Sequence, residues 1–298
     1  MLYHRTEKHL WTQIEIQIIS DLTDTDILIR DLFWYCADFE AEFSRFLSSS
    51  ALSKINNKKS LIVSDRFINL LKLSQSLYEE TGGKFSPFID ISSLGYSKNF
   101  DTGIFKKSAS ASSHKWDVLI QGNMVTLWNN TTLDFWGIGK WYLVEILSGI
   151  LRDKWYKNYC INAGWDLFVS WKNSEEQNWI VGIENPVWSD NYASVSLSDR
   201  CVTTSGSYRR QWCIDSKEYH HIIDPSSCTN LNNYLSITLI WVSVARADAL
   251  TKAIWNTPPW DLENAFLRYN IDGVVIAIDG TVFVSPGCIS YYNFSLFQ

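Results

Sequence analysis

Glycine is scarce in this sequence. Only 14 of the 298 residues are glycine, fewer than the 15 tryptophans, although glycine makes up about 7% of an average globular chain. Proline is also scarce, with 6 residues, and no stretch rich in proline, glycine or serine divides the chain. Because a boundary between domains usually contains such a stretch, residues 1–298 are expected to form one domain.

Excess positive charge and long apolar runs are lacking as well. The 32 acidic residues outnumber the 26 lysines and arginines, so nucleic acid is not an expected partner. The longest apolar stretch, residues 234–245, is about half as long as a membrane-spanning helix, so no transmembrane segment is expected. Residues 1–10 lack the apolar core of a secretory signal, which predicts a cytoplasmic protein and leaves export open if residues precede Met1. The six cysteines have no CxxC spacing, so no zinc or redox centre is indicated.

Hydrophobic periodicity predicts a mixture of helices and strands. Alternating isoleucines predict a strand over residues 13–19, and apolar residues at helical spacing predict helices over 26–46 and 65–81. Further strands are expected at 117–121, 124–128, 193–197, 235–244, 273–278 and 281–284, with helices at 142–152 and 245–255. Strands that mix irregularly with helices favour an α+β fold over a doubly wound parallel sheet.

One candidate site is the segment of residues 133–140, which is expected to lead from a strand into a helix. It contains two glycines and Lys140, and the free backbone N–H groups of such a turn can bind phosphate. The spacing of a Walker A loop is absent, so an ordinary turn is the alternative.

Two other segments carry ionisable residues. His221 could accept a proton near neutral pH or be an ordinary structural histidine, which is the commoner case, and Asp224 could orient it or cap the next turn. Asp248, Thr251 and Lys252 lie on one face of a predicted helix. The carboxylate and hydroxyl could hold a cation such as Mg²⁺, or Asp248 and Lys252 could form an ordinary solvated ion pair.

In order and spacing, eight segments resemble the ApbE family of FAD:protein FMN transferases over nearly the full chain. Each is weak alone, but eight in register are hard to produce by chance. The segments are residues 42–56, 81–96, 133–140, 161–164, 181–186, 204–206, 221–225 and 247–250.

The resemblance implies a paired T-fold, mainly of antiparallel sheets with flanking helices. It also implies Mg²⁺-dependent transfer of FMN from FAD to a Ser or Thr hydroxyl of a target flavoprotein, with release of AMP. His221 and Asp224 match the catalytic positions, and Gly137, Asp248, Thr251 and Lys252 match the metal-binding positions. The positions that match contacts to the flavin nucleotide are Leu10, Thr12, Phe46, Leu94, Gly95, Tyr96, Asp134, Lys140, Ser205 and Ile222. An FAD pyrophosphatase that uses water as acceptor is the alternative enzyme.

The sequence departs from the family pattern at the metal site. The family has a threonine four residues after the aspartate, where this chain has Lys252, and Thr251 stands one position early. The Lys252 ammonium could partly replace the cation, or Thr251 could still coordinate it.

The sequence also departs at glycines, because Trp11, Trp136, Trp141 and Trp165 stand where the family has glycine. One hypothesis is an inactive relative with true tryptophans, which would bind flavin weakly or serve only as an interaction module. The other is a gene that uses UGA for glycine and was translated with UGA as tryptophan. Replacement by one residue type, repeated at several positions, favours the second hypothesis. As tryptophans, these side chains would partly fill the nucleotide pocket.

Overall fold

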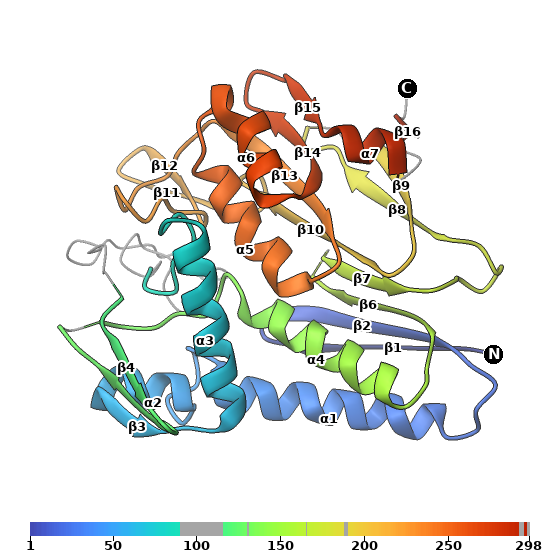
Figure 1. The fold of residues 1–298 in the computed structure, drawn as a ribbon, viewed down its shortest axis with the longest axis horizontal. Coiled ribbons are helices and arrows are strands. Elements are labelled where there is room, and N and C mark those ends of the chain that lie inside the picture. The colour runs from blue at the N-terminus through green and yellow to red at the C-terminus, as the bar shows by residue number, and fades with distance from the viewer. Residues whose placement is uncertain (90–115, 130, 165, 188–189, 292–294, 297–298) are drawn as a thin grey trace.

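A central antiparallel sheet organises the protein (Figure 1). The computed structural model describes residues 1–89, 116–129, 131–164, 166–187, 190–291 and 295–296. The eight strands of the sheet lie in the order β1-β2-β6-β7-β10-β13-β14-β15, and every neighbouring pair is antiparallel. Their bounds are β1 Leu2–His9, β2 Thr12–Ile19, β6 Asn158–Ala163, β7 Leu167–Ser170, β10 Arg200–Gly206, β13 Tyr234–Trp241, β14 Asp272–Ala277 and β15 Val282–Val284. The α+β prediction is confirmed.

Helices cover one face of this sheet, because each has an apolar stripe that needs a partner. Along α1, for example, Leu28, Leu32, Cys36, Phe39 and Phe43 are buried at intervals of three or four residues. The helices on this face are α1 Thr25–Phe43, α2 Ala51–Lys58, α3 Asp65–Glu80, α4 Gly139–Asp153, α5 Val244–Trp255 and α6 Leu262–Tyr269. The short helix η3, Pro259–Asp261, links α5 to α6 and has no buried residue, and α7, Pro286–Tyr291, packs on the opposite side of the sheet through Cys288. No helix in the part of the chain that the structure describes is long and apolar enough to cross a membrane.

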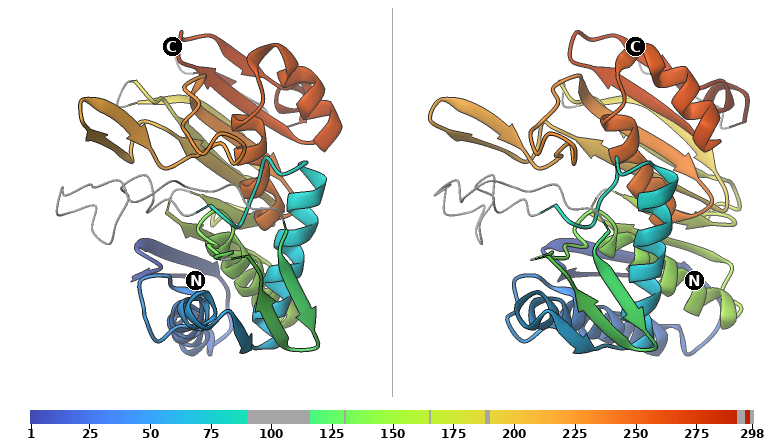
Figure 2. Two further views of the ribbon diagram at one scale, coloured as in Figure 1. Left: turned by 90° about the vertical axis from the view of Figure 1, so that its left-hand side faces the viewer. Right: turned by 60° about the vertical axis from the view of Figure 1, so that its left-hand side comes forward.

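The opposite face of the sheet packs on a smaller sheet of β8 (Trp179–Glu184), β9 (Asn191–Leu197) and β16 (Ser295–Leu296). Side chains alternate between the two faces: Val202 and Ile240 join the cluster under the small sheet, whereas Cys201 and Leu239 join the helix-covered core. Beside the helices lies a sheet of β3 (Ser60–Ile62), β5 (Met124–Leu127) and β4 (Val118–Gln121). The hairpin of β11 (Gln211–Ile214) and β12 (Lys217–His220) projects from the body (Figure 2).

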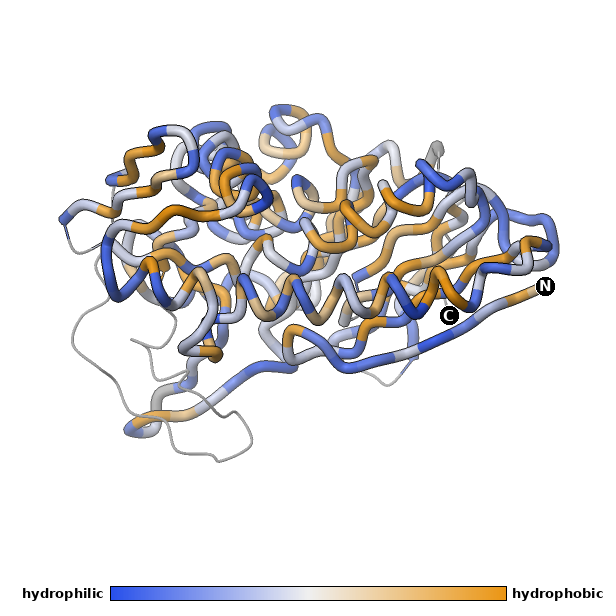
Figure 3. Tube along the Cα trace, turned by 90° about the horizontal axis from the view of Figure 1, so that it is seen from below, coloured by the Kyte–Doolittle hydropathy of each residue, from blue (hydrophilic) through white to orange (hydrophobic). Residues whose placement is uncertain are grey.

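Strand β1 is absent from the sequence predictions. Its residues are mostly exposed and hydrophilic (Figure 3), so it lacks an alternating apolar pattern. It is a strand because it pairs with β2 along its whole length, from Leu2 opposite Ile19 to His9 opposite Thr12. The hydrogen-bonded pairing with β2 therefore makes β1 a strand although its own sequence has no strand pattern.

The approach to α4 differs from the prediction of a strand leading into a helix at residue 142. β5 ends at Leu127, and residues 131–135 form no regular element. Leu133 instead exchanges two hydrogen bonds of 2.8 Å with the Asn56 side chain. The helix begins at Gly139, so Lys140 lies in its first turn.

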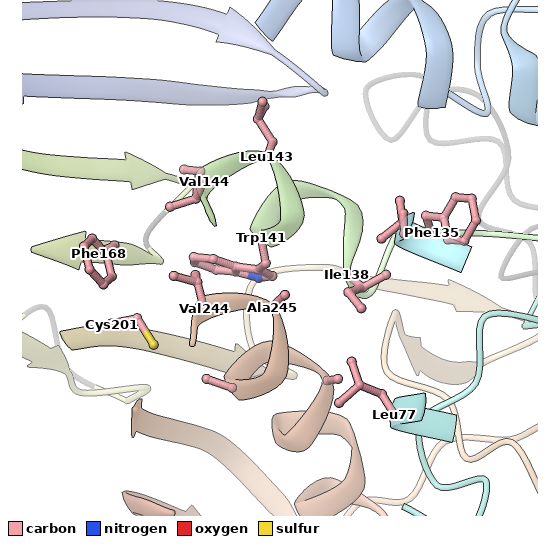
Figure 4. Close-up of a cluster of buried hydrophobic side chains, with 14 of the residues drawn as sticks. Leu77, Phe135, Ile138, Trp141, Leu143, Val144, Phe168, Cys201, Val244 and Ala245 are labelled. Atoms are coloured by element: carbon pink, nitrogen blue, oxygen red, sulfur yellow. The ribbon is translucent and has the colours of Figure 1, made fainter. Parts of the chain in front are cut away.

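Trp141 also lies in the first turn of α4, and its side chain is fully buried in the core between α4 and α5 (Figure 4). Its indole N–H has no hydrogen-bond partner among the described residues. Trp255 is equally buried, but its indole N–H donates to the Leu231 carbonyl at 3.0 Å. A buried donor without a partner destabilises a fold, so Trp141 fits its place less well than Trp255.

Candidate active site

Two neighbouring cavities share the turn that precedes α4. Cavity 1 has a volume of about 50 Å³ and is lined mainly by apolar and aromatic residues, among them Leu10, Trp11 and Phe46. Cavity 2 has a volume of about 60 Å³. Asp134 and Trp136 line both. Since ligand pockets usually measure ~300–1,000 Å³, each is small for a dinucleotide as long as this turn lies between them.

The turn is fixed through the Asp134 carboxylate. One oxygen accepts from the Trp136 backbone N–H at 2.8 Å, and the other forms an ion pair with Arg45 at 2.8 Å. The Trp136 ring lies near two guanidinium groups, with ring-centre distances of 5.0 Å to Arg45 and 4.9 Å to Arg210. These contacts hold an indole ring at the wall between the cavities.

The first turn of α4 places Lys140 beside a buried carboxylate that the sequence predictions did not include. The Lys140 ammonium lies 3.3 Å from Asp166, which also accepts from the Thr204 backbone N–H at 2.6 Å. Burial raises the pKa of Asp166, and Asp248 adds to the increase, while Lys140 opposes it. Asp166 follows the matched segment 161–164 closely, so the motif pointed to it.

A second ion pair lies beside the first. The Lys252 ammonium contacts the Asp248 carboxylate one helical turn earlier on α5, and Asp248 is almost fully buried. Lys252 lines cavity 2, and its Cε lies 3.7 Å from the point where a Cβ on Gly137 would stand. The ammonium therefore sits between the two positions that resemble metal-binding positions of the family.

The predicted ligands do not fit a Mg²⁺ ion in this arrangement. The Thr251 hydroxyl donates to the Asp248 carbonyl at 2.6 Å and lies 2.7 Å from the Ser205 hydroxyl, so it is engaged in the core. The Asp248 carboxylate is paired with Lys252. No group of three or more His, Cys, Asp or Glu side chains within the described ranges could hold a metal. A hard cation needs several free oxygen donors, and the residues in place offer too few.

His221 lines cavity 2 next to Lys252. Burial lowers the pKa of His221 well below its usual value, and Arg210, His220, Lys252 and Lys140 lower it further. Its Nδ1 is buried, with no hydrogen-bond partner among the residues described. The lowered pKa keeps the His221 imidazole neutral, so its ring can accept a proton from a ligand in the cavity, as a weaker base than an exposed histidine.

Asp224 does not orient His221 through any hydrogen bond that the described residues show. Its carboxylate accepts from the backbone N–H and hydroxyl groups of Ser226 and Ser227 at 2.6–3.2 Å. Burial alone would raise the pKa of Asp224, but these hydrogen bonds lower it below its usual value. Of the two roles considered from the sequence, these bonds perform the capping of the next turn.

Eight of the sixteen predicted site residues line the two cavities. Cavity 1 includes Leu10, Phe46, Asp134 and Lys140, and cavity 2 includes Asp134, Gly137, His221, Ile222 and Lys252. Thr12, Ser205, Asp224, Asp248 and Thr251 line neither cavity. Leu94, Gly95, Tyr96 and Trp165 lie outside the described residues.

Sequence reasoning missed three further cationic residues of this region. Arg45 lines cavity 1, Lys84 lines cavity 2, and Arg210 acts on His221. Lys84 donates to the Thr257 hydroxyl at 2.9 Å, and burial lowers its pKa, with Arg268 adding to the decrease. Arg45 and Lys84 lie inside the matched segments 42–56 and 81–96, so position in those motifs was the available signal.

The fold is an α+β fold, and the two cavities, together called the cleft below, lie at the start of α4. Cationic side chains at the start of a helix favour an anionic ligand. The chain belongs to the ApbE family, whose family model matches residues 10–271. This confirms the resemblance that the motifs indicated.

Individual relatives agree with this membership. The FAD:protein FMN transferase of Escherichia coli (strain K12) is 26% identical over 154 residues, which cover 51% of this chain and 44% of that protein. That of Buchnera aphidicola subsp. Schizaphis graminum is 25% identical over 243 residues, 72% of this chain and 68% of that protein. The crystal structure of the ApbE protein from Thermotoga maritima has a TM-score of 0.86 at 23% identity and covers 96% of this chain and 97% of that one. The matches cover 44% of the length of the Escherichia coli protein and 35% of the length of the Salmonella typhimurium protein.

Proposed function

We propose that this protein is an FAD:protein FMN transferase that moves FMN from FAD onto a Ser or Thr hydroxyl of a target flavoprotein and releases AMP. The observation that carries the proposal is the position of His221, a neutral imidazole in cavity 2 beside the Lys252 ammonium. Family membership supports the substrate.

The reaction is an in-line displacement at the FMN phosphorus. The acceptor oxygen forms a bond to this phosphorus, the anhydride bond to AMP breaks, and the hydroxyl proton passes to His221. AMP leaves with the bridging oxygen and its electron pair. A neutral histidine is required because a protonated one could not accept this proton.

Positive charge around the turn suits the negative charge of the diphosphate. The cationic side chains of the two cavities and their rim are Arg45, Lys84, Lys140, Arg210 and Lys252, and the carboxylates beside them are Asp134, Asp166 and Asp248. Five cations against three anions leave a positive excess, which favours a polyanionic ligand. The family resemblance predicts Mg²⁺ as a further partner, but we assign it no step, because two of its predicted oxygen donors, the Asp248 carboxylate and the Thr251 hydroxyl, are engaged within the protein.

The test is incubation of the purified chain with FAD and a flavoprotein from the same genome, followed by denaturing electrophoresis and flavin fluorescence. Fluorescence that stays on the acceptor band supports transfer. Free FMN and AMP with no labelled acceptor would instead identify an FAD pyrophosphatase. Unchanged FAD would indicate a binding or interaction protein.

A further inference from the structure

The Asp248–Lys252 pair differs from an ordinary ion pair on a helix surface. Only 5% of the Asp248 side chain and 20% of the Lys252 side chain are exposed. Exposed pairs at this spacing are solvated and interchangeable with other partners, whereas a buried charge needs a fixed partner. This pair therefore has one stable arrangement, with the ammonium at the wall of cavity 2.

The second ion pair, Lys140–Asp166, lies close enough to the first to interact with it electrostatically. Asp166 senses both Asp248 and Lys252 electrostatically, so the four groups form one cluster of two carboxylates and two ammonium groups. A divalent cation entering here would have to displace Lys252 from Asp248 and would then face two ammonium groups. Both steps are unfavourable in a site of low dielectric.

We propose that the Lys252 ammonium is the built-in cation of this cleft: it occupies the place of a divalent metal ion and binds the diphosphate of the substrate directly. The assignment rests on the proposed function for the identity of that diphosphate. The side chain is tethered to α5, paired with Asp248 and adjacent to Gly137. The cleft should accordingly bind diphosphate in the absence of divalent metal.

The first part of the proposal, that Lys252 occupies the place of a divalent metal ion, is tested by binding of Mn²⁺ to the full chain without any nucleotide. Free Mn²⁺ is measured by electron paramagnetic resonance for the unaltered protein and for Lys252→Met, Lys252→Thr and the control Lys172→Met, a lysine bonded to Asn178 away from the cleft. We expect both Lys252 variants to bind one Mn²⁺ at least about tenfold more tightly than the unaltered protein, and Lys172→Met to behave like the unaltered protein. Combining Asp248→Asn with either Lys252 variant should abolish this gain in Mn²⁺ affinity.

The second part, that Lys252 binds the diphosphate directly, is tested by binding of inorganic pyrophosphate. Calorimetry measures this binding once in EDTA and once in Mg²⁺. The unaltered protein should bind equally well under both conditions, and Lys252→Met should bind at least about tenfold more weakly in EDTA. Two results would overturn the proposal: Mn²⁺ binding to the unaltered protein that Asp248→Asn removes, or Lys252 variants that gain no Mn²⁺ site. Because neither measurement uses FAD or an acceptor, a failure of the proposed function would appear separately, as missing FMN transfer.

A different observation, the backbone conformation at three tryptophans, carries a second inference. Twelve non-glycine residues of the described part have positive φ, and Trp11, Trp155 and Trp171 are among them with φ of 60°, 64° and 53°. Bulky residues rarely adopt this conformation, which glycine adopts freely. None of the three gains a buried position in return, since their exposed fractions are 47%, 84% and 52%.

Trp155 is the clearest of these positions. It directly follows the C-cap of α4, and the chain there forms two hydrogen bonds, from Trp155 N–H to the Arg152 carbonyl at 2.9 Å and from Tyr156 N–H to the Leu151 carbonyl at 3.0 Å. This pair of bonds is the Schellman motif, whose left-handed residue is usually glycine.

We infer that the gene specifies glycine at positions 11, 155 and 171. The codons test this directly: UGA at all three, with UGG at Trp34 and Trp255, supports it, and UGG at any of the three overturns it for that position. Thermal unfolding supplies an independent readout. Trp155→Gly should raise the melting temperature, whereas Trp34→Gly, on the exposed face of α1, should lower it.

Discussion

The two cavities on either side of the turn at residues 134–136 are built from different chemistry. Cavity 1 is bounded mainly by aromatic and apolar side chains from the turn between β1 and β2, from α1 and from the loop after it, and Arg45 and Lys140 are among its lining residues. Cavity 2 contains His221 and two lysines, Lys84 and Lys252, in addition to the Asp134 carboxylate that it shares with cavity 1. The first suits the packing of flat rings, and the second suits a phosphate group and a proton transfer.

The comparison shows how the turn at residues 134–136 can separate a cavity suited to binding from a cavity suited to catalysis. Trp136 contributes to both cavities, so a change at this residue should alter what can enter, whereas a change at His221 should alter only what happens afterwards. Three predictions follow this division, from the largest expected effect to the smallest.

His221→Asn should nearly abolish FMN transfer and leave FAD affinity within about twofold of the unaltered protein. Loss of a general base costs about 10²–10⁴-fold in rate, and asparagine keeps the polarity of the site. Transfer rates under saturating FAD measure the effect, with His4→Asn on the exposed strand β1 as the control. A rate that falls only in proportion to FAD affinity would place His221 among the binding residues instead.

Trp136→Gly should join the two cavities and raise FAD affinity by about tenfold or more, because a Trp side chain covers ~150–250 Å² where it packs. Titration by flavin fluorescence compares this variant with the unaltered protein. Trp260→Gly, which removes an 86% exposed indole from η3, should leave affinity unchanged. Tight FAD binding by the unaltered protein, equal to that of Trp136→Gly, would refute the role of Trp136 as a barrier.

The smallest effect concerns stability and pH. Burial, with the cations around it, lowers the pKa of His221 well below its usual value, so below pH ~6.5 the unfolded chain binds a proton that the folded chain does not. The stability contributed by neutral His221 is therefore present above pH ~6.5 and is lost at about 1.4 kcal/mol per pH unit as the pH falls further.

A glutamine at position 221 cannot bind this proton. Between pH 7.5 and pH 5.5 the unfolding free energy of His221→Gln should therefore fall less than that of the unaltered protein. Urea unfolding at both pH values measures the difference. An equal pH dependence in the two proteins would show that His221 is protonated in the folded state.

The sequence by itself determined the elements that carry their own periodic pattern. The predicted helices at 26–46, 65–81, 142–152 and 245–255 correspond to α1, α3, α4 and α5, with ends that moved by up to three residues. The alternating isoleucines of β2 were also sufficient, because a half-buried strand shows its buried face locally. The order of the motifs was enough to indicate the family.

Only the tertiary structure decided what these motifs do to one another. Arg45 and Asp134 are 89 positions apart and form an ion pair at the turn, and Lys140 meets Asp166 across 26 positions. The pairing of Lys252 with Asp248, rather than with solvent, depends on burial by neighbouring elements. Periodicity describes which face of an element is apolar, but the charge, pKa and open volume of a site depend on the groups that distant segments bring beside it.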